Sequence, residues 1–371
     1  MRAIDCEVLV IGGGVAGTLI VSILARSGLH VIHVVAAPTQ SERPYEVLGP
    51  STRRALAQHG LPEPVRGTAN CRGVLSRWGG DLEFHDYALT ACAPALTVDR
   101  TAFHNSLVSA AHAAGALVLQ QAKVRRGQVL WQPQRAIEVS RDGQSVLVSA
   151  RWVVDATGRQ GSPCAPPQVR REYFDRLVAL SIPFETTQYQ DCLLVEAVPE
   201  GWWYVPPSID GRTQLVFLTD VDLMPRGSVE RREWLGHRYR GSQLVSDVAT
   251  AAPLFLDLKG TDARFSRMSD VVYDQWVAAG DAALALDPLS GTGTWAALNG
   301  AEQVASEFCD HREVGTRYTD WWRQTFERER AMREEVCFRA SLRFPDAPFW
   351  QRRSAGTRRH HAHSLDLRLL P

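Results

Sequence analysis

The chain has 371 residues, of which 45% are hydrophobic and 22% charged, values typical of a globular protein with a sizeable core. Its 41 basic and 41 acidic side chains cancel, which excludes the overall positive field that attracts nucleic acid or an anionic membrane. The seven cysteines form no CxxC pair and argue against a disulfide framework or a zinc site. No apolar run reaches about 18 residues and no basic leader is visible, so we predict a soluble, cytoplasmic protein without a membrane span.

The N-terminal segment predicts a βαβ unit. Residues 6–11 (CEVLVI) and 30–35 (HVIHVV) are apolar runs typical of buried strands. Residues 15–28 between them have helical periodicity and end in a glycine. This order of elements is the start of a Rossmann-like α/β fold.

A glycine-rich turn joins the first strand to the helix. It has the GxGxxG pattern of Gly12, Gly14 and Gly17, with Val15 and Ala16 opening the helix. The first glycine permits the tight turn, the second admits a pyrophosphate to the backbone, and the third lets helix and strand pack closely. We therefore predict a dinucleotide site. The acid that usually binds the adenosine ribose is missing, since the second strand ends in apolar residues 34–36.

The elements change in character along the chain. Residues 50–60 and 100–115 predict helices, residues 176–260 predict short antiparallel strands separated by turns, and residues 292–340 have a helical pattern. The predicted architecture is a Rossmann-like domain with an inserted antiparallel β-sheet domain and a C-terminal helical region. The predicted boundaries are 1–170 and 266–310 for the dinucleotide-binding domain, 171–265 for the inserted substrate domain, and 311–371 for the helical region and basic tail.

Two later segments narrow the choice of dinucleotide. Residues 152–159 (WVVDATGR) and 277–301 (VAAGDAALALDPLSGTGTWAALNGA) each run from a strand into a loop, and Arg100 opens a predicted helix. Together with the glycine turn, they resemble the ordered motifs of the superfamily of FAD-dependent aromatic hydroxylases and tryptophan halogenases. The resemblance covers about residues 1–310 and implies FAD as the cofactor.

The motifs and the resemblance together predict the cofactor contacts. Asp281 is expected to accept hydrogen bonds from ribityl hydroxyls, and the loop that begins at Pro288 to present backbone N–H groups to the flavin. Glu46 matches an acid near the cofactor in this superfamily, with a solvated loop glutamate as the alternative. The predicted contacts are Gly12, Gly14, Val15, Ala16, Gly17, Glu46, Arg100, Val124, Asp155, Gly158, Gly280, Asp281, Pro288, Gly291, Thr292 and Gly293.

The stretch GWWYVPP (201–207) is the candidate substrate wall. On a strand, Trp202 and Tyr204 share one face and Trp203 takes the other. Trp202 and Tyr204 are predicted to hold an aromatic substrate by stacking. The alternative, core packing of the sheet on a helix, is favoured for at least one of the two tryptophans.

The resemblance leaves more than one flavin chemistry open. Halogenases need a lysine early in the chain and a glutamate in the flavin loop, whereas this sequence has no lysine before Lys123 and has Ser290 in place of the glutamate. Hydroxylation through a C4a-hydroperoxyflavin needs no protein nucleophile, so no catalytic side chain is assigned. It does require O2 and electrons from NADH, NADPH or a separate reductase.

The predicted substrate is an aromatic ring, favoured as the indole of a tryptophan. The GWWY stretch and the DPLSG loop also resemble flavoproteins that modify tryptophan residues of a partner polypeptide during tryptophylquinone biogenesis. A peptidyl tryptophan is therefore favoured over a free small aromatic. A reductase of the geranylgeranyl reductase type, a halogenase and a non-catalytic flavoprotein remain as alternatives.

Three further features carry less weight. His360, His361 and His363 suggest a metal, but a terminal tract without structure is favoured, and no metal is predicted. Residues 320–335 predict a helix packed on the flavin domain or a surface for a partner. The basic tail from residue 350 is an alternative contact for an acidic partner.

Overall fold

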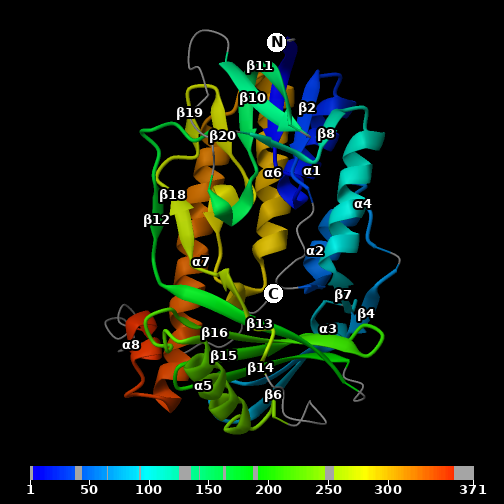
Figure 1. Ribbon diagram of the computed structural model, residues 1–371. Helices are drawn as coiled ribbons and strands as arrows, with labels where there is room; N and C mark the ends of the chain where they lie inside the picture. Colours follow the sequence, from blue (N-terminus) through cyan, green and yellow to red (C-terminus); the bar gives the residue numbers. More distant parts are fainter. Residues whose placement is uncertain are drawn as a thin grey trace.

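The computed structural model describes residues 3–37, 44–64, 66–91, 93–124, 135–141, 143–161, 164–186, 191–246 and 255–354. Two sheets form the framework, a dinucleotide-binding sheet at the top of Figure 1 and a second sheet lying across the bottom. The His-rich tract and residues 355–371 of the predicted tail lie outside the described residues. Among the helices of the described ranges, none has the length and apolar character needed to cross a membrane.

The upper sheet has the predicted parallel core. Its order is β19-β20-β11-β1-β2-β8, and β10 adds to β11 with β9 beyond it. β1 pairs in parallel with both β2 and β11, and β11 pairs in parallel with β20, so segments far apart in the chain share one sheet. The strands are β1 (Ala3–Ile11), β2 (Val31–Val35), β8 (Leu117–Gln120), β9 (Ala122–Val124), β10 (Arg135–Arg141), β11 (Gln144–Asp155), β19 (Val272–Tyr273) and β20 (Trp276–Ala278).

Helices from both ends of the chain bury the upper sheet. Side chains of α1, α4, α6 and the first half of α7 join the strands in a single hydrophobic core. The C-terminal half of α7 continues down to the lower sheet, where α8 lies (Figure 1). The helices are α1 (Val15–Arg26), α2 (Pro50–Gln58), α3 (Tyr87–Thr90), α4 (Arg100–Ala113), α5 (Ser228–Arg240), α6 (Gly293–His311), α7 (Thr316–Arg343) and α8 (Pro348–Ser354).

The lower sheet is antiparallel except where β14 pairs in parallel with β5. Its order is β17-β13-β16-β15-β14-β5-β6. One face packs against α7 and α8, and the other against α5. Its strands are β5 (Gly73–Arg77), β6 (Leu82–Asp86), β13 (Leu177–Glu185), β14 (Cys192–Val198), β15 (Gly201–Val205), β16 (Arg212–Asp220) and β17 (Lys259–Asp262).

Two three-stranded sheets and three short 3-10 helices complete the framework. The sheets have the orders β12-β18-β21 and β3-β7-β4. Their strands are β3 (Tyr45–Leu48), β4 (Thr68–Cys71), β7 (Ala95–Asp99), β12 (Arg171–Tyr173), β18 (Ser266–Met268) and β21 (Leu284–Ala285). The 3-10 helices are η1 (Gly158–Gln160), η2 (Gly280–Ala282) and η3 (Pro288–Ser290).

The predicted mixed α/β fold class is confirmed, and three details differ from the sequence analysis. The lower sheet also recruits β5 and β6 from the N-terminal part of the chain. The segment predicted as strands also contains the helix α5. Its buried side chains Leu235 and Tyr239 lie one turn apart, so a helix places both on the face that packs on the sheet. The segment 292–340, predicted to be helical, contains the two helices α6 and α7. The first ends where Arg312 has a left-handed backbone conformation with φ of 60°.

The alternation predicted for GWWYVPP is present on β15. Trp203 is 0% exposed and lies on the α5 face, with its ring 4.6 Å from that of Phe217 and 6.1 Å from that of Tyr239. Trp202 belongs to the cluster on the opposite face. The interpretation of one tryptophan as core packing is therefore confirmed for Trp203.

Replacing Trp203 with alanine should lower the free energy of unfolding by about 3–5 kcal/mol, because it removes a fully buried ring and leaves a cavity. Chemical denaturation of the variant and the wild type measures the difference. Leu342→Ala serves as the control, since this α7 side chain is 67% exposed and its loss should change stability little. Equal effects of the two substitutions would contradict the assigned burial of Trp203.

Candidate functional site

The glycines of the turn between β1 and α1 have two different roles, close backbone packing and space for a ligand. Gly12 has φ of 120°, and a Cβ there would lie 2.1 Å from the carbonyl oxygen of Ala156. A Cβ on Gly17 would lie 2.0 Å from the Gly12 oxygen. Gly14 has an ordinary φ of −74°, and a Cβ there would meet nothing within 4 Å. The protein's own packing therefore requires Gly12 and Gly17, while Gly14 borders open space suited to a ligand.

The N-terminus of α1, at this turn, is free to bind an anion. The helix starts with Val15 and Ala16, its N-cap Gly14 provides no side-chain hydrogen bond, and the first turn has no acidic residue. The unpaired N–H groups and the positive helix end remain for a negatively charged ligand. Gly280, in the third motif, packs against this turn, since its Cβ would lie 2.8 Å from the Ala16 Cβ.

The loop that opens α6 has the same properties. Pro288 begins η3, and the chain reverses at Gly291, which has φ of 63°. A Cβ on Gly291 or Gly293 would meet nothing within 4 Å. Thr292 is the N-cap of α6 but makes no capping hydrogen bond, so a second uncapped helix start faces open space. α6 also packs against α1.

Glu46 and Arg100 are brought together next to this second helix. Arg100 Nη1 lies 3.2 Å from Glu46 Oε2, and the hydroxyl of Thr294 donates to Glu46 Oε1. Asp99 does not pair with Arg100, because its carboxylate caps α4 by accepting from the Ala102 amide at 2.8 Å. The structure therefore places Glu46 in a polar cluster at the first turn of α6 and not as an isolated loop residue.

The acidic residues of the second and third motifs are held by neighbours. Asp155 is buried and accepts from the amide and hydroxyl of Thr157 at 3.1 and 2.7 Å. Asp281 accepts from Arg159 Nε at 3.0 Å, so a ribityl hydroxyl would share this carboxylate with the guanidinium. Gly158, with φ of 75°, opens η1 beside it, and a Cβ there would meet nothing within 4 Å. Val124 ends β9, half-buried.

Arg333 of α7 joins the loop before α6 (residues 287–293, called the flavin loop) to the crossover between the two sheets. Its Nε donates to Asp287 Oδ2 at 2.7 Å, and its Nη2 donates to Asp175 Oδ2 at 2.6 Å. The other oxygen of Asp287 accepts from the Leu289 amide at 3.0 Å and so caps η3. Burial raises the pKa of Asp175, and the Arg333 charge opposes that rise. Position 333 carries no sequence signal for this role.

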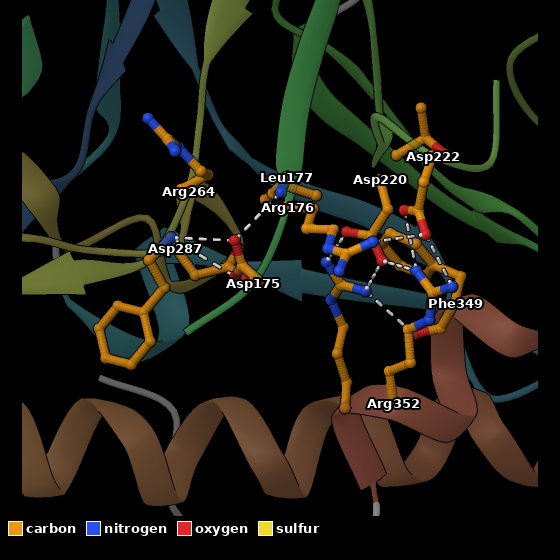
Figure 2. A network of polar contacts seen from close by, with 12 residues as sticks. Asp175, Arg176, Leu177, Asp220, Asp222, Arg264, Asp287, Phe349 and Arg352 are labelled. Carbon is orange, nitrogen blue, oxygen red and sulfur yellow. Dashed lines mark hydrogen bonds and ion pairs between the residues drawn. The ribbon is translucent and has the colours of Figure 1, made fainter. Parts of the chain in front are cut away.

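A second set of ion pairs lies beside the first around a charged cavity of about 300 Å³. Arg353 of α8 donates to both oxygens of Asp220 at 2.6 and 3.0 Å, and Arg352 donates to Asp220 at 3.1 Å and to both oxygens of Asp222 (Figure 2). These contacts fasten α8 to the end of β16. Asp175 and Arg333, which form an ion pair with each other, also line this cavity, so the two sets of ion pairs are neighbours.

A buried carboxylate reaches the flavin loop from α7. Glu329 is 4% exposed, and its Oε2 accepts from the Thr292 hydroxyl at 3.0 Å. It lines a small pocket with Leu289, Ser290 and Met332. The sequence analysis missed this residue because nothing in the order of residues 320–335 shows that one turn of a long charged helix faces residues 290–292.

The predicted substrate wall and the flavin loop border the same apolar cluster. Trp202 is buried, with its ring 6.1 Å from that of Trp78 in an edge-on contact. Tyr204 is half-buried and packs against the cluster that contains Trp202, and so does Leu289 of the flavin loop. Tyr204 and Leu289 thus border one apolar cluster, and the stacking role of Trp202 and Tyr204 stays a prediction. Tyr204 retains exposed surface, whereas Trp202 is 3% exposed.

The comparisons with known proteins identify the family. The model of the FAD binding domain family matches residues 5–335, and the chain belongs to this family. The putative FAD-dependent oxidoreductase LodB of Marinomonas mediterranea is 25% identical over 368 residues, covering 96% of this chain and 99% of LodB. The tryptophan 2-halogenase of Chondromyces crocatus is 26% identical, covering 81% of this chain but 60% of the halogenase.

Solved structures share the fold. The peptidyl tryptophan dihydroxylase QhpG, described as essential for tryptophylquinone cofactor biogenesis, has a TM-score of 0.77 at 23% identity, with 94% of this chain and 79% of QhpG covered. The p-nitrophenol 4-monooxygenase PnpA from Pseudomonas putida has a TM-score of 0.74 at 20% identity, with 96% and 93% covered. At these identities the solved structures show a shared fold, and the match over residues 5–335 makes the chain a member of the FAD binding domain family.

The site fits FAD. The open space at Gly14 suits the pyrophosphate, and the open space at Gly291 and Gly293 lies at the helix start predicted to face the ring. Both helix ends favour negative charge. The individual contacts assigned to the sixteen predicted residues remain predictions.

Replacing Gly14 with valine should weaken FAD binding at least about tenfold while the apoprotein stays folded. The backbone at Gly14 accepts any L-residue, but the new side chain would fill the space bordered by the α1 N-terminus. Titration of apoprotein with FAD, followed by flavin fluorescence, measures the affinity. Gly79→Ala is the control, since its Cβ would meet only one arginine nitrogen, at 3.8 Å. Unchanged affinity in Gly14→Val would show that the turn is structural only.

Replacing Arg333 with methionine should destabilise the protein by about 3–5 kcal/mol, because two carboxylates, each 6% exposed, lose their charged partner. Thermal unfolding of the apoprotein measures the loss. Arg330→Met on the same helix is the control, because its side chain is 50% exposed and its ion pairs should contribute about 0–1 kcal/mol. If the two variants unfold alike, the bridge made by Arg333 does not stabilise the fold.

Proposed function

We propose that this member of the FAD-binding family is a monooxygenase that hydroxylates an aromatic substrate, favoured as the indole of a tryptophan residue in a partner polypeptide. The observation that carries the proposal is that Tyr204 of the aromatic strand and Leu289 of the flavin loop pack against one apolar cluster. Tyr204 supplies a partly exposed ring at this place, and stacking on such a ring favours an aromatic substrate. Trp202 supports that wall from behind through its contact with Trp78.

The positions of the lysines favour oxygen transfer over halogenation. The chain has two lysines, Lys123 and Lys259. Lys123 lies exposed on β9 of the upper sheet, and Lys259 lies exposed at the start of β17, an edge strand of the lower sheet. Neither belongs to an element that forms the flavin loop or the aromatic wall. The lysine that the halogenase resemblance requires therefore has no counterpart at the site.

The preference for a peptidyl substrate has one support beyond the residues of the wall. The solved structures that share the fold include a protein named as a peptidyl tryptophan dihydroxylase. The match to the tryptophan 2-halogenase leaves two fifths of that protein uncovered. A free small aromatic is the second candidate substrate.

The residues of this chain would bind and orient the cofactor and substrate. The α1 N-terminus would hold the pyrophosphate, and the Arg100–Glu46 pair would fix the first turn of α6. The α6 N-terminus would stabilise negative charge on the reduced ring. When bound and reduced by NADH, NADPH or a separate reductase, FAD supplies the electrons for O2 activation. The apolar cluster under β15 would exclude water from the reacting centre.

With reduced FAD, O2 and a tryptophan-containing peptide, the product should gain mass in steps of one oxygen atom, with ¹⁸O2 as the source of the label. Mass spectrometry in the presence and absence of chloride and bromide makes the measurement. A free indole compound serves as the parallel substrate that separates the two candidates. A product that carries chlorine or bromine would refute the hydroxylase assignment, and substrate reduction without O2 would favour the reductase alternative.

The wall should affect turnover more than cofactor binding. Tyr204→Ala is expected to lower the rate of substrate oxidation by about two- to tenfold while leaving FAD affinity within about twofold, because it removes a stacking surface worth about 0.5–1.5 kcal/mol. Tyr273→Ala, at the edge of the upper sheet and 39% exposed, is the matched control. Loss of FAD binding in Tyr204→Ala would assign this residue to the cofactor site.

A further inference from the structure

One buried histidine interrupts an otherwise aliphatic strand. β2 reads Val-Ile-His-Val-Val, and all five residues are buried, His33 with 0% exposure. The mechanism above makes no use of this side chain. A buried imidazole in such a strand lowers the stability of the fold unless it forms hydrogen bonds.

The ring of His33 makes one hydrogen bond, to the glycine turn. Its Nε2 lies 2.9 Å from the carbonyl oxygen of Gly12. Burial lowers the pKa of His33 to about 4, so the ring is neutral at neutral pH and has a single N–H. Because a carbonyl oxygen can only accept, Nε2 donates and Nδ1 carries the lone pair. Nδ1 has no hydrogen-bond partner within the described part of the chain.

The same strand also holds the other side of Gly12. The Gly12 amide donates to the Val34 carbonyl at 2.9 Å, so both polar groups of this residue are bonded to β2. Since a trans peptide places its C=O and N–H on opposite sides, a Gly12 carbonyl held against β2 directs the Gly13 N–H away from β2. The carbonyl also sits where a Cβ on Gly17 would lie 2.0 Å from it, so its position is tightly confined.

We propose that His33 is a positioning residue for the pyrophosphate turn, whose Nε2–H anchors the Gly12 carbonyl so that the Gly13 amide stays directed at the anionic cofactor. This role rests on FAD as the cofactor and is independent of the substrate. It explains why a strand of valine and isoleucine contains a residue that leaves one buried nitrogen without a partner. The orphaned Nδ1 lowers stability, while the Nε2 bond preorganises the backbone donors.

The test compares His33→Gln with His33→Met. The two replacement side chains have similar length, but only glutamine ends in a donor that can reach the Gly12 oxygen. FAD titration of the apoprotein and its thermal unfolding are measured for both. The methionine variant should bind FAD about tenfold more weakly than wild type, the glutamine variant within about threefold, and the apoprotein of the methionine variant should unfold close to the wild-type temperature. Ile32→Val, whose side chain alternates to the other face of the same strand, is the control for altered packing.

Two outcomes would overturn the proposal. Equal FAD affinity in wild type and His33→Met would show that the hydrogen bond does not organise the turn. Equal weakening in both variants, accompanied by a matching loss of thermal stability, would reduce His33 to a packing residue. In either case wild-type protein still binds FAD, whereas failure of the wild type to bind FAD would instead contradict the proposed function.

Discussion

The double ion pair of Arg333 is the constraint on which the geometry of the site depends. Its guanidinium bonds Asp287, which caps the flavin loop, and Asp175, at the crossover into the lower sheet. A planar guanidinium can satisfy two carboxylates at fixed angles, which a lysine could not do. The loop, the crossover and α7 are thereby held in one arrangement, so the aromatic strand β15 and the start of α6 keep their relative positions.

The sequence predicted elements well where local pattern determines them. The strands β13 and β14 lie within residues 176–260, where short antiparallel strands were predicted. The glycine turn was predictable because Gly12 and Gly17 each meet a local steric need. The pairing of β14 with β5 was not, because it joins segments more than a hundred residues apart and no pattern in either strand specifies the other. Likewise, α5 buries few side chains, so its apolar face is too narrow to stand out.

In the candidate site, too, some residues could be predicted from the sequence and others could not. Motif residues such as Gly14 and Gly291 could be named from the sequence, because a glycine beside open space follows from the shape of the turn itself. The residues that hold the motifs could not. Arg159 reaches Asp281 across 122 positions, and Glu329 reaches Thr292 across 37. Such partners are fixed by packing of distant helices and loops, which leaves no trace in local composition.

Glu329 supplies a carboxylate at the flavin loop, where the sequence analysis found none. Ser290 replaces the loop glutamate expected of a halogenase, but a buried carboxylate from α7 lines the same small pocket and bonds the neighbouring Thr292. The absence of a loop glutamate therefore no longer means the absence of a carboxylate at the loop. The lysine is different, because both lysines lie exposed on β9 and β17, outside the elements that form the site. A carboxylate can orient a ring or a proton in either reaction, whereas only halogen transfer by the lysine route needs the amine. The preference for oxygen transfer thus depends on the missing lysine alone.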